Sequence, residues 1–328
     1  MSSARPTLRD TASTTRAVVL DSPEHLALRT LPLTPAGPAD IVVDTLYSGI
    51  STGTERLLWS GRMPDFPGMG YPLVPGYESV GIVREAGAES GLAAGDCVFV
   101  PGARCFGEVR GLFGGSASTL VVPGARVVPL DAQIGEQGVL MALAATAYHA
   151  VAGDSHHGRI VPPELIVGHG VLGRLLARMT VVAGFAPPTV WELNPVRMAG
   201  DGYPVLRPED DPRRDYRAIY DVSGDASILD SLVARLAHGG EVVLAGFYSE
   251  RLAFDFAPAF MREAQIRAAA EWRRADLLAV KELVETGRVS LADLITHRER
   301  AAHAAHAYPV AFGDAGCLKM VLDWRECA

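Results

Sequence analysis

A glycine-rich turn stands between two apolar patterns in Leu165-Ile166-Val167-Gly168-His169-Gly170-Val171-Leu172-Gly173. The run before the turn is typical of a strand, whereas the apolar residues after it, as far as Met179, follow helical spacing. Glycine lets the backbone approach a diphosphate closely, and the start of the helix offers N–H groups to the anion. The stretch therefore predicts a dinucleotide-binding strand–turn–helix unit. Its predicted contact residues are Gly168, His169, Gly170, Val171, Leu172 and Gly173.

An acidic residue ends the next strand-like run, Thr189-Val190-Trp191-Glu192. Glu192 lies close to the separation of about 20 residues from the first glycine that is expected of a ribose-binding carboxylate. A carboxylate accepts hydrogen bonds from ribose hydroxyls and repels a 2′-phosphate, so we expect NAD rather than NADP as the cofactor. Arg197 is the counter-signal, because an arginine accommodates a 2′-phosphate. The alternative is an ordinary glycine turn with a surface glutamate.

The composition sets the class of protein. The chain has 328 residues, of which 48% are hydrophobic, and a formal net charge of −8. This is enough for two domains with a substantial core, and lysine and arginine form no basic stripe, so we expect no nucleic-acid partner. No apolar run reaches transmembrane length, and the polar start lacks a signal-peptide core. Four widely spaced cysteines suggest no disulfide framework, so we expect a cytoplasmic protein, with peripheral membrane contact left open.

The two halves of the chain differ in pattern. The first half has short strand-like runs at 16–20, 40–47, 80–83 and 97–100 and a long loop over 61–76, which is typical of an antiparallel barrel. From about Gly138, strands and helices alternate, which indicates a doubly wound parallel sheet. We expect helices over 139–151, 228–236 and 275–285, and strands over 165–167, 189–192, 218–222 and 241–246.

Four motifs resemble those of the medium-chain dehydrogenase/reductase superfamily: Gly49-Ile50-Ser51, Pro75-Gly76-Tyr77-Glu78, Gly95-Asp96-Cys97-Val98 and Gly114-Gly115-Ser116-Ala117. The resemblance implies an α/β protein with a Rossmann doubly wound parallel sheet and a GroES-like, β-barrel-type catalytic domain. It implies a catalytic domain over 1–143, an NAD-binding domain over 144–272 and a return segment over 273–328 that completes the catalytic domain. It also implies cofactor contacts from Thr146, Ser223 and Gly246, and a homodimer, since dimers are common in this superfamily.

A finer resemblance rests on the stretches 47–55, 75–78, 294–298 and 319–324. They are similar to dehydrogenases of bacteriochlorophyll synthesis that act on a hydroxyethyl side chain. This implies oxidation of the 3-(1-hydroxyethyl) group of chlorophyllide or bacteriochlorophyllide a to 3-acetyl, with hydride transfer to NAD and a magnesium tetrapyrrole as substrate. Two alternatives stay open: a zinc-less NAD(P)H-dependent enone or quinone reductase, and a non-catalytic pigment carrier whose cofactor fold is structural.

The residues at the metal-ligand positions differ from the ligands of zinc-dependent members. The three catalytic ligands would fall at Ser51, Tyr77 and Ala142. A hydroxyl, a phenol and a methyl group do not hold zinc, which needs thiolate, imidazole or carboxylate donors. The structural zinc lobe needs four closely spaced cysteines, and residues 101–115 contain one. We therefore predict no bound metal. The alternative is a rearranged site built from Glu78 and a histidine such as His149 or His157.

Without a metal ion, hydrogen-bonding side chains must stabilise the developing alkoxide and take the hydroxyl proton. Ser51, Thr52 and Tyr77 align with the lost metal shell and are the candidates for contact with the substrate hydroxyl. Glu78 is predicted to orient them or to relay the proton, and His149, near the domain junction, is a further candidate because histidine is a common proton-transfer residue. The structural alternatives are a polar turn at 51–54, a Tyr77 that only fills volume, a Glu78 held by an arginine such as Arg56, and a packing role for His149.

The loop over 57–71 is the candidate substrate surface. A tetrapyrrole is large, flat and apolar, with a propionate at one edge, and this loop carries aromatic and methionine side chains with arginines nearby. We expect substrate contacts from Arg56, Trp59, Arg62, Met63, Phe66, Met69 and Tyr71, with Arg110 as a further cation. The alternative is a surface loop packed on its own domain with solvated arginines.

Overall fold

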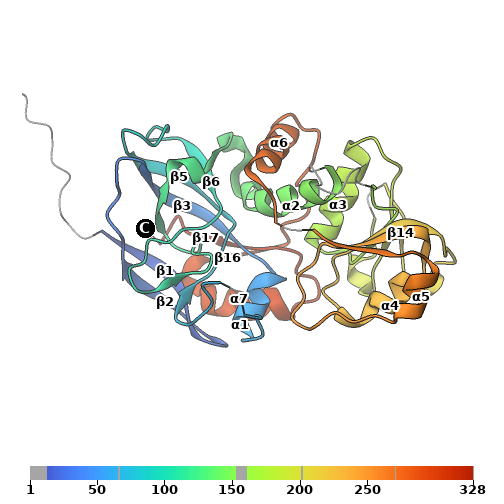
Figure 1. Ribbon diagram of the computed structural model, residues 1–328. Coiled ribbons are helices and arrows are strands. Elements are labelled where there is room, and N and C mark those ends of the chain that lie inside the picture. Colours follow the sequence, from blue (N-terminus) through green and yellow to red (C-terminus); the bar gives the residue numbers. More distant parts are fainter. Residues whose placement is uncertain (1–12, 66, 153–160, 201, 270, 328) are drawn as a thin grey trace, which may run out of the picture.

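The computed structural model describes residues 13–65, 67–152, 161–200, 202–269 and 271–327. It has a first part, formed by β1–β9 with β16, β17 and α7, and a second part, formed by β10–β15 with their helices (Figure 1). The helices are α1 (Thr54–Trp59), α2 (Met141–Ala152), α3 (Val171–Val182), α4 (Leu229–Val233), α5 (Phe256–Met261), α6 (Arg274–Glu285) and α7 (Ala304–Gly313). Short 3-10 turns are η1 (Gly124–Arg126), η2 (Ala132–Leu140), η3 (Pro195–Arg197), η4 (Pro208–Asp210), η5 (Ala226–Ile228) and η6 (Ala301–His303).

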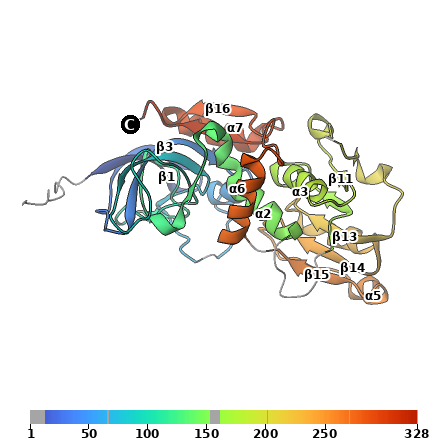
Figure 2. The same cartoon turned by 90° about the horizontal axis from the view of Figure 1, so that it is seen from above.

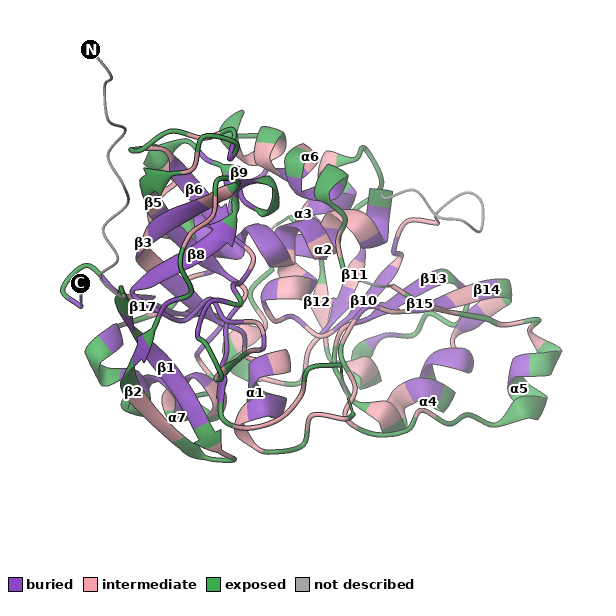
Figure 3. Cartoon of the chain, turned by 60° about the vertical axis from the view of Figure 1, so that its left-hand side comes forward, coloured by how far each residue is buried: buried purple, intermediate pink, exposed green. Residues whose placement is uncertain are grey.

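The first part is built on two sheets. The larger has the strand order β16-β17-β3-β5-β6-β9, with β8 also paired to β3, and the smaller has the order β2-β1-β4-β7. Their bounds are β1 (Thr14–Ser22), β2 (His25–Pro32), β3 (Asp40–Ile50), β4 (Leu73–Val74), β5 (Ser79–Ala86), β6 (Cys97–Val100), β7 (Arg110–Gly111), β8 (Thr119–Pro123), β9 (Val128–Pro129), β16 (His297–Arg300) and β17 (Met320–Asp323). β17 runs antiparallel to β3, with Met320 opposite Ile50, so the last strand of the chain completes a sheet that the first strands begin. Figure 3 shows that β1, β3 and β8 are largely buried.

The described residues of the second part form a six-stranded parallel sheet in the order β12-β11-β10-β13-β14-β15. Its strands are β10 (Leu165–Val167), β11 (Thr189–Trp191), β12 (Val205–Leu206), β13 (Tyr216–Asp221), β14 (Leu236–Leu244) and β15 (Gln265–Ala268). Ile166 packs with α2, α3 and α6, whereas its neighbours Leu165 and Val167 pack with α4 and α5. Figure 1 shows α2, α3 and α6 on one side of β14 and α4 and α5 on the other. The predicted doubly wound parallel sheet is confirmed.

Two helices connect the parts. α2 leads the chain into the second part, α6 begins its return, and the two helices pack against each other (Figure 2). His149 on α2 bonds Asp276 on α6, with 2.8 Å between Nδ1 and Oδ2. No helix within the described residues is both long and apolar enough to cross a membrane.

Two of the expected helices differ from their predicted bounds by more than one residue. The helix expected over 228–236 ends at Val233, and Leu236 already begins β14 opposite Tyr216. Leu236 keeps helical spacing with Leu229 and Leu232, but all three are buried in the same cluster, so the pairing of Leu236 with β13 overrides the local pattern. The helix expected from residue 139 begins at Met141, after the 3-10 segment η2.

Candidate active site

Ser51 and Tyr77 meet where the lost metal ligands would lie. Ser51 directly follows β3, and Tyr77 lies two residues before β5, its antiparallel neighbour. The Tyr77 hydroxyl donates a hydrogen bond of 2.5 Å to Ser51 Oγ, and the Tyr77 ring meets Phe113 edge-on at 5.1 Å between centroids. Burial and the nearby Glu78 raise the pKa of Tyr77 well above its usual range. Tyr77 therefore stays protonated and acts as a donor.

Glu78 forms a buried ion pair with Lys319. Lys319 Nζ donates to Glu78 Oε2 at 2.6 Å, and both side chains are almost fully shielded from solvent. Burial raises the pKa of Glu78, and the Lys319 ammonium opposes that rise. The predicted structural alternative named the wrong cation, because Arg56 is exposed and Lys319 holds the carboxylate. Glu78 Oε1 is buried without a hydrogen-bond partner, so the carboxylate keeps an unused acceptor.

Glu55 is a functional candidate that sequence reasoning missed. Its Oε1 accepts the Ser51 N–H at 3.1 Å, and its Oε2 accepts the Tyr308 hydroxyl at 2.9 Å. Burial raises the pKa of Glu55 to about 7, and the charge of Glu78 adds to this effect. The only available signal was a carboxylate within a stretch already taken to be catalytic. Two buried carboxyl groups and one buried lysine therefore lie close to Ser51 and Tyr77.

The residues around Ser51 do not fit a zinc ion. Tyr77 packs against the apolar cluster that contains Ala142, so the three positions of the zinc ligands share one region. Their donors are a hydroxyl, a phenol that holds its proton and a methyl group, none of which suits zinc. Within the described ranges, no group of three or more His, Cys, Asp or Glu side chains is placed to hold a metal ion. The absence of a metal stays a prediction, and His157 lies outside these ranges.

The glycine turn fits a dinucleotide diphosphate. Gly168 has φ +103°, which favours glycine, and a Cβ at Gly173 would stand 1.9 Å from the Gly168 carbonyl oxygen. Gly170 is the N-cap of the twelve-residue α3 and offers no side-chain cap, so the first N–H groups of α3 are left for an anion. A Cβ at Gly170 would meet nothing within 4 Å, which marks open space in front of the helix. Val171 and Leu172 supply the first helical N–H groups.

Glu192 lies beside this turn, but backbone groups hold its carboxylate. Oε2 accepts the His169 N–H at 3.0 Å, and Oε1 accepts those of Leu193 and Asn194 at 2.7 and 2.8 Å. A carboxylate has about four acceptor positions, so one remains on Oε2. The His169 ring is buried between the Arg197 carbonyl (2.6 Å) and the Tyr203 hydroxyl (2.9 Å), and burial lowers its pKa. The His169 side chain thus links the glycine turn to the segment that contains Arg197 and Tyr203.

Two other predicted cofactor residues, Ser223 and Gly246, lie at the carboxyl edge of the parallel sheet. They follow β13, which pairs with β10, and β14, which pairs with β13. The Gly246 N–H donates to the Asp221 carbonyl, and its Cβ position is 3.3 Å from Val222 Cα, so this chain crossing is close. The Thr146 hydroxyl donates to the Ala142 carbonyl at 3.0 Å within α2. The Thr146 hydroxyl proton is therefore used within α2, and its contact with the cofactor stays a prediction.

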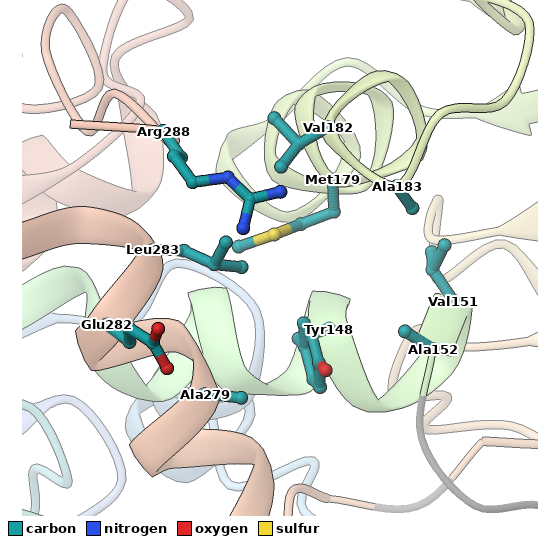
Figure 4. A pocket seen from close by; sticks show the side chains of 10 residues that line it. All are labelled: Tyr148, Val151, Ala152, Met179, Val182, Ala183, Ala279, Glu282, Leu283 and Arg288. Atoms are coloured by element: carbon teal, nitrogen blue, oxygen red, sulfur yellow. The ribbon is translucent and has the colours of Figure 1, made fainter. Parts of the chain in front are cut away.

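A hollow of about 270 Å³ lies between α2, α3 and α6 (Figure 4). Tyr148, Met179 and Leu283 line it, with Glu282 and Arg288 at its polar side. None of the candidate catalytic residues lines this hollow. His149, the next residue on α2, is engaged by Asp276, which is the contact that a packing role predicts.

The predicted substrate loop is partly packed on its own part of the protein. The Trp59 ring lies 6.2 and 6.3 Å from those of Tyr308 and Phe312. Met63, Met69 and Tyr71 pack against one buried leucine cluster, which consists of Leu20, Leu58, Leu73 and Leu112. The arginines are exposed: Arg56, Arg62 and Arg110. Phe66 lies outside the described residues. The loop's contacts with a substrate stay a prediction.

Comparison with known proteins identifies the family. Residues 37–132 match the alcohol dehydrogenase GroES-like domain. The chain is 56% identical over 320 residues to the 2-desacetyl-2-hydroxyethyl bacteriochlorophyllide A dehydrogenase of Cereibacter sphaeroides, covering 96% of this chain and 99% of the relative. It is 57% identical over 314 residues to the enzyme of that name from Rhodobacter capsulatus, covering 95% and 99%.

A solved structure supports the architecture. The L-idonate 5-dehydrogenase of Escherichia coli K-12 has a TM-score of 0.80 at 17% identity, over 95% of this chain and 98% of its own. The expected Rossmann sheet with a GroES-like domain is thereby confirmed. On the near full-length identity to the two bacterial relatives, the chain belongs to the family of 2-desacetyl-2-hydroxyethyl bacteriochlorophyllide A dehydrogenases.

Proposed function

We propose that this protein oxidises the 3-(1-hydroxyethyl) group of chlorophyllide or bacteriochlorophyllide a to 3-acetyl with NAD, using polar side chains in place of a catalytic zinc. The observation that carries the proposal is the near full-length identity to two relatives that are named for this hydroxyethyl pigment. The Ser51–Tyr77 hydrogen bond supports the chemistry, because it supplies a preorganised donor where zinc enzymes hold their metal.

Ser51 is the proposed contact of the substrate hydroxyl. Its Oγ accepts the Tyr77 hydrogen bond, which leaves the Ser51 proton for the substrate oxygen. Negative charge develops on that oxygen as the carbinol carbon loses hydride, and the Ser51 hydroxyl, polarised by Tyr77, stabilises it. Half-buried Thr52 accepts the released hydroxyl proton on its Oγ and donates its own hydroxyl proton to a solvent water. Glu78, fixed by Lys319, orients Tyr77 through the adjoining backbone.

NAD is the proposed cofactor, and when bound its nicotinamide supplies the hydride acceptor. Gly168, Gly170 and Gly173 are proposed to hold the diphosphate against the start of α3. Glu192 is proposed to accept a ribose hydroxyl at its remaining position, and its charge disfavours a 2′-phosphate. We propose that residues 1–143 form the catalytic domain and that residues 144–272 bind NAD. Residues 273–328 return to the catalytic domain and complete it.

A homodimer is proposed through the outer edge of the second part. β15 ends the sheet, and the neighbouring α5 exposes Phe256 (72%), Phe260 (65%) and Met261 (70%). Among the described residues no strand pairs with the outer side of β15, and such an edge beside exposed aromatic rings suits pairing with a second copy about a twofold axis. Light scattering of the wild type and of Phe256→Ser/Phe260→Ser tests this: the wild type is expected as a dimer and the variant as a monomer.

The proposed reaction is tested by anaerobic incubation with NAD and 3-hydroxyethyl chlorophyllide, with and without a chelator. The 3-acetyl pigment and NADH are expected in equal amounts at a rate that the chelator leaves unchanged. Loss of activity on chelation would overturn the zinc-independent mechanism. Pigment binding without NADH formation would instead identify a carrier, and reduction of an enone or quinone preferentially with NADPH would identify a reductase.

A further inference from the structure

Arg197 joins the second part to the first. Its Nε donates to the Ala315 carbonyl at 3.0 Å, and its Nη2 donates to the Cys317 carbonyl at 2.9 Å. Asn194 Nδ2 adds a third bond, of 2.9 Å, to the Ala315 carbonyl. Residues 314–317 lie between α7 and β17, and β17 pairs with β3 of the first part. We call these three bonds the Arg197 clasp.

The clasp begins at the glycine turn. The Arg197 carbonyl contacts His169 Nδ1 at 2.6 Å and accepts from Arg174 Nη2 at 3.3 Å. Glu192 shapes the same segment, because it accepts the N–H groups of His169 and Asn194. The backbone of Arg197 is thus bound to the proposed cofactor turn, while its side chain is bound to the opposite part.

The clasp ends close to the candidate active site. Two residues beyond Cys317, Lys319 enters the buried ion pair with Glu78. The Lys319 carbonyl accepts the N–H groups of Thr296 and His297, both at 3.1 Å, so this segment is also fixed to the chain that leads into β16. Hydrogen bonds and a short stretch of chain therefore connect the turn at Gly168, through Arg197, to the Glu78 carboxylate next to Tyr77.

We propose that Arg197 is a positioning residue that sets the placement of the cofactor turn relative to the Ser51–Tyr77 pair, and that its guanidinium does not serve a 2′-phosphate. The planar guanidinium suits this role because its fork fixes two carbonyl oxygens at once. The proposal rests on the NAD-dependent function above. It also explains the sequence counter-signal, because the arginine at the position of a 2′-phosphate ligand directs its Nε–H and one Nη2 N–H to carbonyl groups of the first part.

The test compares Arg197→Ala, Glu192→Ser and the double variant, using fluorescence titration with NADH and NADPH and steady-state kinetics with the hydroxyethyl pigment. Arg197→Ala is expected to keep the ratio of the two dissociation constants within about twofold of the wild-type ratio. Its kcat is expected to fall by at least about tenfold, because the two parts are no longer held in register. Adding Arg197→Ala to Glu192→Ser is expected to leave the NADPH dissociation constant unchanged.

Arg207→Ala is the matched control, since it removes one exposed arginine of the same part and should change neither quantity. If Arg197→Ala does not fold, Arg197→Lys replaces it; lysine keeps the charge but cannot fork, so a reduced kcat with an unchanged ratio is again expected. Weaker NADPH binding by about tenfold when Arg197 is removed from Glu192→Ser would overturn the proposal, as would a full kcat in Arg197→Ala. A wild type that binds neither dinucleotide would instead overturn the proposed function.

Discussion

Lys319 pairs with Glu78 from a distant part of the chain: the two residues are 241 positions apart in the sequence, and 2.6 Å separate Nζ from Oε2. The pair is sealed from solvent, and Gly49 makes room for it, because a Cβ there would lie 2.2 Å from Glu78 Oε2. Glu55 brings a second buried carboxyl group to the same region. Lys319 pairs with Glu78, whereas the Glu55 carboxyl group is held by the Ser51 N–H and the Tyr308 hydroxyl.

Breaking the ion pair is expected to destabilise the protein strongly. Lys319→Met leaves Glu78 buried without its cation, which should lower the free energy of unfolding by about 3–5 kcal/mol. The double variant Glu78→Gln/Lys319→Met removes both charges and should recover most of that loss. Urea unfolding followed by circular dichroism measures both values. Equal losses in the single and double variants would contradict the pairing.

The Ser51–Tyr77 pair is expected to control turnover. Ser51→Ala removes the proposed donor to the substrate oxygen and should lower kcat by about 10²-fold. Tyr77→Phe removes only the group that polarises Ser51 and should lower kcat less, and the two effects should not add, because the residues act as one unit. Tyr148→Phe, a tyrosine that faces the hollow between α2, α3 and α6, is the control with unchanged kcat. If Ser51→Ala and Tyr77→Phe both keep full turnover, the site assignment is wrong.

Glu55 is expected to make stability depend on pH. Burial raises the pKa of Glu55 from 4.5 to about 7, with Glu78, Lys319, Tyr77 and Tyr308 around it. Between these two pH values the folded chain holds a proton that the unfolded chain has released, so stability falls as pH rises, by up to about 1.4 kcal/mol per pH unit. Above pH 7 both states are ionised and this decline ends.

Glu55→Gln removes this ionisation and keeps an oxygen for the Ser51 N–H. The variant should therefore gain stability relative to the wild type as the pH rises from 5 to 8, as measured by urea unfolding at each pH. Glu250→Gln, at an exposed glutamate, is the control. A difference between Glu55→Gln and the wild type that stays constant over this range would show that Glu55 does not titrate there.

Local pattern was enough to predict the elements that bind the proposed cofactor. The β-branched run, the glycine turn and the apolar spacing to Met179 are local signals, and β10 and α3 form where they predict. The resemblance placed Ser51 and Tyr77 together, and their hydrogen bond joins strands that pair directly. Such features depend on neighbours along the chain or on one strand pairing.

Long-range partners could not be predicted in the same way. A buried carboxylate needs a cation, but the sequence does not show which cation it will meet. Arg56 lies closer to Glu78 in the sequence than Lys319 does. Arg197 similarly matched a phosphate ligand by its position, whereas its carbonyl partners lie 118 and 120 residues away. Contacts of this kind appear only when the return segment is placed against both parts.

Two glycines of the turn are expected to respond differently to an added methyl group. Gly173→Ala would place a Cβ 1.9 Å from the Gly168 carbonyl oxygen, so it should destabilise the fold. At Gly170 an added Cβ meets nothing within 4 Å and φ is −74°, so Gly170→Ala should keep the wild-type unfolding midpoint. Its methyl group would nevertheless stand in front of α3, where the diphosphate approaches, and should weaken NADH binding by at least about tenfold. Thermal unfolding and NADH fluorescence titration separate the two effects, with Gly313→Ala, also in open space, as the control. A Gly170→Ala variant that binds NADH as tightly as the wild type would place the dinucleotide somewhere other than this turn.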